Sequence, residues 1–258
     1  MLTFNTVQLI TLISSFFWPM VRILSFFSIA PIFNYKLINK KNKIILSCVI
    51  SFLIFPFLPE THTPLFSFFG LLLLFQQILI GIVLGFIAQF LFITVNFAGE
   101  VIGLQMGLSF AAFFNNNNYI GTSIISRLLN ILTLLFFLVF NAHLYLISML
   151  IDSFYTMPID TYFLNINVFF ILLQFSSTIF LNGLLLILPI MIILLVISFT
   201  MSLLNRLSPQ ISIFSIGFPL NLLTGILVLY FLISSMFPFF EKMLHESIFF
   251  ISDLFIQI

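Results

Sequence analysis

The chain has 258 residues, of which 62% are hydrophobic and only 6% are charged, and its mean hydropathy is +1.31. The few polar side chains are not enough to cover the surface of a water-soluble domain. The apolar surface is therefore expected to lie in lipid. The net charge of +1, with no dense basic stretch, excludes a nucleic-acid groove, and the single cysteine, Cys48, excludes an internal disulfide.

Six apolar stretches follow one another along the chain. They run over residues 9–33, 44–58, 65–97, 128–151, 168–204 and 211–240. A helix that crosses a bilayer needs about 20 such residues, and the stretches are continuous rather than alternating, which disfavours a membrane β-barrel. The sequence therefore predicts an all-α polytopic membrane protein with about six hydrophobic helical segments.

Two of these stretches do not have the length of one straight span. Residues 44–58 are short and are followed by Pro59, whereas residues 168–204 are too long and contain Asn182-Gly183 and Pro189. Proline removes a backbone donor and clashes with the preceding helical turn. Some helices are therefore expected to be kinked or broken into hairpins.

The few charged residues predict the topology. Basic connections, with four lysines after the first stretch and then Arg127 and Arg206, alternate with acidic ones that carry Glu60 or Asp152 and Asp160. The positive-inside rule then places the basic connections in the cytoplasm and both termini outside. The tail over residues 241–258 mixes charged and aromatic residues, which predicts an amphipathic helix at the membrane surface or against a partner.

Small residues recur every four positions in the third stretch and beyond it. They are Gly81 and Gly85, then Gly99, Gly103, Gly107 and Ala111. This spacing places them on one helical face, where another backbone can approach closely, and we interpret Gly81 and Gly85 as packing residues. The later group also holds Glu100, Gln105 and Ser109 and leads into four asparagines at 115–118. That segment is expected to face protein or water rather than lipid.

Several charges lie at or within apolar stretches. A charge inside hydrocarbon costs roughly 2.5–3.5 kcal/mol on insertion scales, so each needs water or a partner. Arg127 and Arg206 are interpreted as cytoplasmic anchors, and Glu100 lies at the end of its apolar run. Arg22 lies well inside the first stretch, so it is expected to pair within an assembly or to line a polar interior.

The sequence contains none of the common catalytic motifs. His245-Glu246 lacks the second histidine of a zinc-binding HExxH motif, and neither a Gly-x-Ser-x-Gly motif nor a phosphate-binding loop occurs. The sequence therefore predicts a protein that is not an enzyme, with no metal and no cofactor. A stand-alone small-solute transporter is the alternative, because helix breakers at 182–183, 189 and 219 could lie at mid-membrane. The scarcity of buried ionisable groups and of a repeat pair disfavours it.

Several motifs, in order along nearly the whole chain, resemble the FliR family. The longest are Ala98-Gly99-Glu100-Val101-Ile102-Gly103-Leu104-Gln105-Met106-Gly107-Leu108-Ser109-Phe110-Ala111 and Leu204-Asn205-Arg206-Leu207-Ser208-Pro209-Gln210, which continues to Ile216-Gly217-Phe218-Pro219-Leu220. Shorter ones are Phe17-Trp18-Pro19-x-x-Arg22, Ala30-Pro31-Ile32, Gln76-Gln77-Ile78-Leu79-Ile80-Gly81 and Phe140-Asn141-x-His143. This family is the flagellar counterpart of the R/T subunit of type III secretion export gates.

The resemblance implies a subunit of the flagellar type III protein export gate, in the bacterial inner membrane and the flagellar basal body. One copy is expected to combine with several P and Q subunits (FliP and FliQ) in a closed helical assembly. FlhB, FlhA and unfolded flagellar export substrates are the further implied partners. Residues 1–167 would be P-subunit-like, with a plug loop near 105–118. Residues 168–258 would be a Q-subunit-like hairpin with the amphipathic tail. The family also implies helices displaced toward the periplasm after assembly.

The motifs also supply three groups of candidate site residues. The plug would comprise Gln105, Met106, Gly107, Leu108, Ser109, Phe110, Ala111, Phe113 and Phe114, which combine backbone freedom with apolar bulk. Helix packing would involve Gly81, Gly85, Gly99 and Gly103, and assembly would involve Arg22, Glu100, Arg206, Pro209 and Gln210. The asparagines at 115–118 depart from the family pattern, and they are expected to keep the far side of the loop hydrated.

Overall fold

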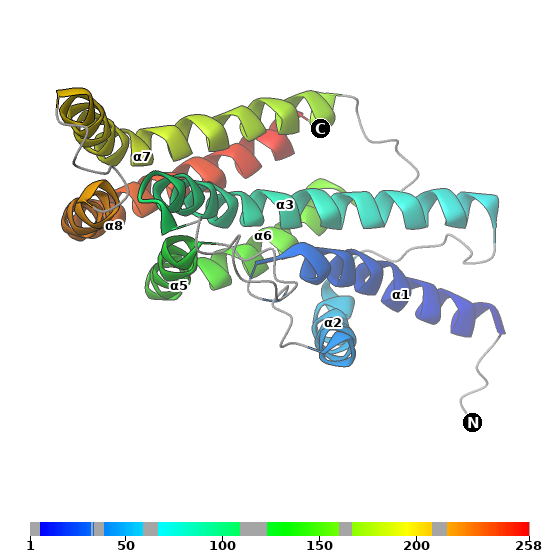
Figure 1. Cartoon of the computed structure of the whole chain (residues 1–258). Helices are drawn as coiled ribbons and strands as arrows, with labels where there is room; N and C mark the ends of the chain where they lie inside the picture. Colours follow the sequence, from blue (N-terminus) through cyan, green and yellow to red (C-terminus); the bar gives the residue numbers. More distant parts are fainter. Residues whose placement is uncertain are drawn as a thin grey trace. The chain divides into compact units, whose positions relative to one another are not determined.

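The computed structural model describes residues 6–31, 33, 39–58, 67–108, 123–159, 167–207 and 216–257 (Figure 1). Among these residues there is no strand, and the all-α prediction is confirmed. The elements are α1 (Thr6–Ile29), α2 (Lys40–Ile54), the short 3-10 helix η1 (Phe55–Phe57), α3 (Phe68–Gln105), α5 (Ile124–Val139), α6 (Ala142–Thr156), α7 (Asn167–Leu207) and α8 (Phe218–Gln257).

Four of these helices are long and apolar enough to cross a membrane. The qualifying segments are Thr11–Ile29 of α1, Phe68–Gln105 of α3, Leu172–Leu207 of α7 and Phe218–Ser252 of α8, and the bent pair α5 and α6 could form a fifth span. The stretch that begins at residue 44 forms α2, which has 15 residues and is about 22 Å long. A hydrocarbon core of about 30 Å exceeds that length, so α2 does not count as a span.

Helix α7 is continuous where the sequence predicted an interruption. Its 41 residues pass through Asn182-Gly183 and through Pro189 without a break. Ile187 and Ile190, on either side of the proline, are fully buried. Packing on both sides therefore holds the helix together although the proline removes one backbone hydrogen bond. At about 62 Å, α7 is roughly twice as long as the hydrocarbon core is thick.

The stretch over residues 128–151, expected as one helix, is divided into two. Helix α5 ends at Val139, and α6 begins at Ala142 after Asn141, which adopts a left-handed conformation with φ 53° and ψ 26°. Asparagine tolerates this conformation better than most residues, so the chain can turn sharply there without a glycine. At its other end α5 is capped by Ser123, whose side chain accepts a hydrogen bond from the Ser126 amide at 3.1 Å.

Contacts between helices divide the chain into two compact units. Unit 1 comprises Met1–Phe90, Asn141–Phe175 and Glu246–Ile258, and unit 2 comprises Leu91–Phe140 and Ser176–His245. Helices α3, α7 and α8 each contribute to both units. The tail expected at residues 241–258 continues α8 as far as Gln257. The sequence also predicted a division near residue 167 between a part like the P subunit and a part like the Q subunit. That division stays a prediction.

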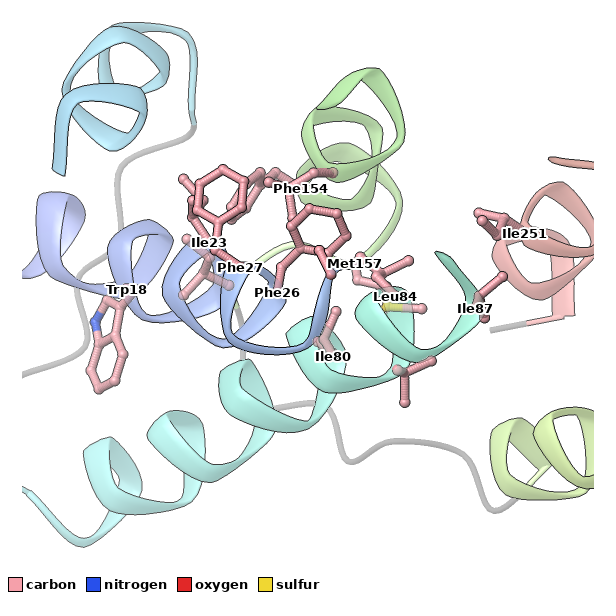
Figure 2. Close-up of a cluster of buried hydrophobic side chains, with 14 of the residues drawn as sticks. Trp18, Ile23, Phe26, Phe27, Ile80, Leu84, Ile87, Phe154, Met157 and Ile251 are labelled. Carbon is pink, nitrogen blue, oxygen red and sulfur yellow. The ribbon is translucent and has the colours of Figure 1, made fainter. Parts of the chain in front are cut away.

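The core of unit 1 lies where α1, α3 and α6 meet. Figure 2 shows the buried side chains that α1 (Ile23, Phe26 and Phe27), α3 (Ile80 and Leu84) and α6 (Phe154) contribute to it. Helix α2 packs on α1 through its small residues Ser47 and Ser51, both fully buried, and the Ser51 hydroxyl donates to the Phe16 carbonyl at 3.0 Å. Small side chains on α2 allow this close approach.

The core of unit 2 is built from α3, α5, α7 and α8. Most of its buried residues recur every three or four positions, as one face of each helix requires. They are Val95, Ala98, Ile102 and Met106 of α3, Ile125 and Leu129 of α5, Leu186, Ile187, Ile190 and Leu194 of α7, and Leu229, Leu232 and Met236 of α8. Phe136 and Phe140 add ring contacts to Phe237 and Phe240 of α8, with centroids 4.9–5.9 Å apart.

Candidate functional site

The side chain of Arg22 is fully buried inside unit 1 and bonded to two other helices. Its Nε donates to Oε1 of Gln77 on α3 at 2.6 Å. One Nη donates to the Ser153 carbonyl at 2.7 Å and to its hydroxyl at 3.2 Å, and the other donates to the Met157 carbonyl at 2.8 Å. The guanidinium also lies 4.3 Å from the ring centroid of Phe154. We call this group of residues the Arg22 node.

All the acceptors of the Arg22 node are neutral. Two of them are carbonyls at the C-terminal end of α6, where the helix dipole is negative. The ring face of Phe154 adds a cation–π attraction. The hydrogen bonds of Arg22 are made within the chain, and its expected role in assembly stays a prediction. The sequence motifs that hold Arg22 and Gln77 meet at this point.

Gly81 and Gly85 bring α3 close to α1 beside the same node. A Cβ at Gly81 would overlap the Ser25 hydroxyl and the Arg22 carbonyl oxygen, and one at Gly85 would lie 3.0 Å from the Ile29 Cβ. The Ser25 hydroxyl donates to that Arg22 carbonyl at 2.8 Å. The absence of a side chain at Gly81 thus permits the approach that lets Arg22 reach Gln77.

A second polar group, which we call the Asn96 seam, joins α3 to α5 in unit 2. The Asn96 amide oxygen accepts hydrogen bonds from the Ser126 hydroxyl and, at 3.0 Å, from the Asn130 amide. The Ser123 hydroxyl donates to the Gly99 carbonyl at 3.0 Å. Gly99 permits the approach, since a Cβ there would lie 2.9 Å from the Ser126 amide nitrogen.

Glu100, expected to need water or a partner, bonds within the chain to the start of α5. Its carboxylate accepts a hydrogen bond from the Ser123 backbone amide at 2.9 Å. The first amides of a helix lack helical acceptors and carry the positive end of its dipole, so a carboxylate is favoured there. The Glu100 side chain is half-buried, so it remains partly accessible from outside the chain.

Helix α3 ends at the beginning of the expected plug. Gly107 follows in the left-handed region with φ 78°, a conformation that glycine adopts without strain, and its amide donates to the Leu104 carbonyl at 3.0 Å. Met106 is buried against Gly225 of α8, where a Cβ would come within 2.7 Å of the methionine Cε. Met106 is therefore packed into unit 2 and is not exposed in this chain.

The structure places the other candidate residues as follows. Gly103 is buried on α3, Gln105 and Leu108 are half-buried, and Arg206 is exposed in the last turn of α7. Ser109, Phe110, Ala111, Phe113, Phe114, Pro209 and Gln210 lie outside the described residues.

Several residues that make these contacts were not singled out individually from the sequence, and four of them show why. They are Asn96, Ser126, Ser153 and Gly225. Asn96 lies in an apolar helix and could have been noticed for that reason, as Arg22 was. A serine that bonds through its backbone carbonyl leaves no signal in the sequence. Among the described residues, no group of three or more His, Cys, Asp or Glu side chains gathers to hold a metal ion.

Comparisons with known proteins show the family to which this chain belongs. The family model described as bacterial export proteins, family 1, matches residues 13–247. The chain is 74% identical to a flagellar biosynthetic protein FliR of Buchnera aphidicola subsp. Acyrthosiphon pisum, over 98% of each chain. It is 45% identical to FliR of Escherichia coli K12, over 98% of this chain and 97% of the relative. It is 26% identical to the Yop proteins translocation protein T of Yersinia pestis, over 78% of each.

These observations define a polytopic helical membrane protein in which the Arg22 node and the Asn96 seam join helices through buried or half-buried polar groups. The chain belongs to the bacterial export proteins of family 1, with the flagellar FliR proteins. It is a subunit of the flagellar protein-export apparatus, and its likeness to a translocation protein agrees with type III export.

Proposed function

We propose that this export subunit works in the bacterial inner membrane, within the flagellar basal body, as part of a gate built with the P and Q subunits FliP and FliQ. FlhB, FlhA and unfolded flagellar substrates are its further proposed partners. The full-length match to flagellar FliR proteins supports this role. The proposed role is not enzymatic. The family match disfavours the stand-alone solute transporter.

Within this role, we propose that residues 105–114 close the export path. The supporting observation is the end of α3, where Gly107 stops the helix in a left-handed turn and Met106 is held against Gly225. The segment that follows thus starts from a fixed point in unit 2. A path wide enough for an unfolded chain needs an apolar seal when idle, and an apolar constriction can exclude water and ions.

The test compares a deletion with a substitution in the same loop. Cells carrying the chain with FliP and FliQ, but lacking residues 107–114, are expected to assemble the complex and to leak ions or small solutes. Replacing residues 115–118 with serines is the matched control, because it keeps the hydrated part of the loop polar. Intact complexes with unchanged ion permeability would contradict the seal, and loss of the complex would indicate a packing role.

A second proposal concerns the connection after α7. Arg206 is exposed in the last turn of that helix, and the connection continues to Pro209 and Gln210. We propose that this connection faces the cytoplasm and docks neighbouring gate subunits. Arg206→Glu reverses a charge that favours cytoplasmic placement and the negative end of the helix dipole. Normal co-purification with FliP and FliQ together with normal motility would rule this proposal out.

The size of the purified assembly distinguishes a gate subunit from a protein that acts alone. Native mass measurement after detergent extraction is expected to find this chain as a minority component of a large hetero-oligomer. A monomer or homo-oligomer of this chain alone would contradict the gate. The size of the assembly does not depend on whether residues 105–114 close the export path. The gate and the seal can therefore be contradicted separately.

A further inference from the structure

The Arg22 node contains a buried positive charge that no carboxylate among the described residues balances. Arg22 is fully buried on α1, and its acceptors come from α3 and from the end of α6. These acceptors lie 55, 131 and 135 positions away along the chain. A single side chain therefore connects three helices of unit 1 that the sequence keeps far apart.

The geometry at α6 explains how a charge is tolerated without a counterion. Helix α6 ends at Thr156, and the Met157 carbonyl lies just beyond it, where no further helical turn supplies a donor. The Ser153 carbonyl accepts from the Met157 amide at 3.0 Å as well as from Arg22. Arg22 thus supplies donors at the negative end of the α6 dipole, a place where a cation is favoured.

We propose that Arg22 is a positioning residue that fixes the C-terminal end of α6 against α1 and α3. The planar guanidinium group, and not its charge alone, is needed to hold the end of α6 in this way. Three N–H directions are used at once, toward Gln77, Ser153 and Met157, at 2.6–3.2 Å. A lysine ammonium is a compact charge on a flexible stem and cannot span these three acceptors together. The proposal goes beyond the export-gate role and does not depend on the seal.

The test uses the accessibility of introduced cysteines in native membranes of cells that produce the whole chain with FliP and FliQ. Cys48 is the only cysteine, so Cys48→Ser leaves a chain without thiols. Ile159→Cys then reports on the chain just after α6, because Ile159 is 5% exposed in the unit 1 core. Ile125→Cys on α5, where the isoleucine is 8% exposed in the unit 2 core, is the matched reporter.

Arg22→Lys and Arg22→Met are each expected to raise the rate of maleimide labelling at position 159 by at least about tenfold. Labelling at position 125 is expected to stay unchanged. Gln77→Leu removes one acceptor and is expected to cause a smaller rise at 159. Ser153→Ala removes the 3.2 Å contact of its hydroxyl with Arg22 and the bond of that hydroxyl to the Leu150 carbonyl within α6. It keeps the Ser153 carbonyl as an acceptor for Arg22, so labelling should change less than about twofold.

Two results would overturn the proposal. Labelling at 159 in Arg22→Lys that equals the arginine rate would mean that charge alone suffices. An equal rise at 159 and 125 would mean that the whole chain is destabilised. If Arg22→Met does not accumulate, the labelling rates at 159 and 125 are compared in Arg22→Lys and Gln77→Leu instead. Each of these substitutions leaves a side chain of similar size in the node, a polar one at position 22 and an apolar one at position 77.

Discussion

Helix α3 makes two close contacts along its length, and they accommodate polar groups in different ways. Toward its start, Gly81 admits α1 and the buried polar group is the charged Arg22 node. Toward its end, Gly99 admits α5 and the polar group is the Asn96 seam, in which Asn96, Ser126 and Asn130 are all neutral. A buried charge needs several acceptors from different helices, whereas neutral groups satisfy one another in pairs.

At each contact a glycine and a polar side chain work together. The glycine brings the backbones close, and the nearby polar groups then find partners that an isolated helix could not supply. Disturbing the glycine is therefore expected to cost more than removing one hydrogen bond. Disturbing the charged contact is expected to cost more than disturbing the neutral one.

The largest effect is expected for Gly81→Ala. The added Cβ overlaps the Arg22 carbonyl oxygen, which is backbone and cannot rotate away, so α1 must move and the Arg22 node must stretch. We expect a loss of stability on the order of 3 kcal/mol. Thermal unfolding of the detergent-solubilised chain measures it. Gly85→Ala is the matched control, one turn along the same face with contacts of 3.0–3.3 Å, and an equal loss there would contradict the role of the node.

Gly99→Ala is the corresponding change at the neutral contact, and its expected effect is smaller. Its Cβ meets the Ser126 backbone at the start of α5, so α5 must retreat and the bond from Ser123 to the Gly99 carbonyl lengthens. We expect a loss of about 2 kcal/mol. The same unfolding assay compares it with Gly81→Ala. A larger loss of stability for Gly99→Ala than for Gly81→Ala would contradict the expectation that disturbing the charged contact costs more.

Asn96→Ala tests the neutral seam without changing the backbone approach. It leaves the Ser126 hydroxyl and the Asn130 amide without the oxygen that accepts from both. The expected loss is about 1–2 kcal/mol, the cost of removing neutral hydrogen bonds from a partly buried site. Asn130→Ala removes only one of the two donors to that oxygen and serves as the control, with a smaller expected loss and with urea unfolding of the solubilised chain as the measurement. An Asn96→Ala chain as stable as the unaltered one would show that water replaces the seam.

Glu100→Gln is expected to have the smallest effect. Glutamine keeps an oxygen that can accept from the Ser123 amide, so only the attraction between the carboxylate charge and the start of α5 is lost. We expect a loss of about 0.5 kcal/mol, which added salt should reduce because the side chain is half-exposed. Unfolding at low and high ionic strength measures this. A loss that does not change with salt would point to a hydrogen-bonding role instead.

Much of the fold could be predicted because each long helix is encoded locally. Continuous apolar runs predicted α1, α3, α7 and α8, and the four-residue glycine spacing predicted the face on which α3 meets other helices. The sequence predicted that α7 is interrupted at Pro189, as a kink or a hairpin. The helix runs on through Pro189, with Ile187 and Ile190 buried beside it, so no hairpin forms there. The division at Asn141 was missed, since a left-handed asparagine has no clear pattern in a single sequence.

The candidate site was predictable only in part. Arg22 was identified from its charge in an apolar run, since a buried charge must be satisfied somewhere. Its partners could not be named, because two of them are backbone carbonyls that every residue possesses. Gly225 was not noticed, since its importance comes from the side chain of Met106 that packs on it.

The sequence by itself determined that this chain is a helical membrane protein, and its motifs identified the family that the full-length matches show. Hydrophobicity and motif order are local properties, so they can be read without coordinates. Only the tertiary structure decided that the charge of Arg22 is met by the end of α6 and by Gln77. The physical reason is that burial forces each polar group to find a partner in space, and several arrangements of the same helices would satisfy the same local pattern.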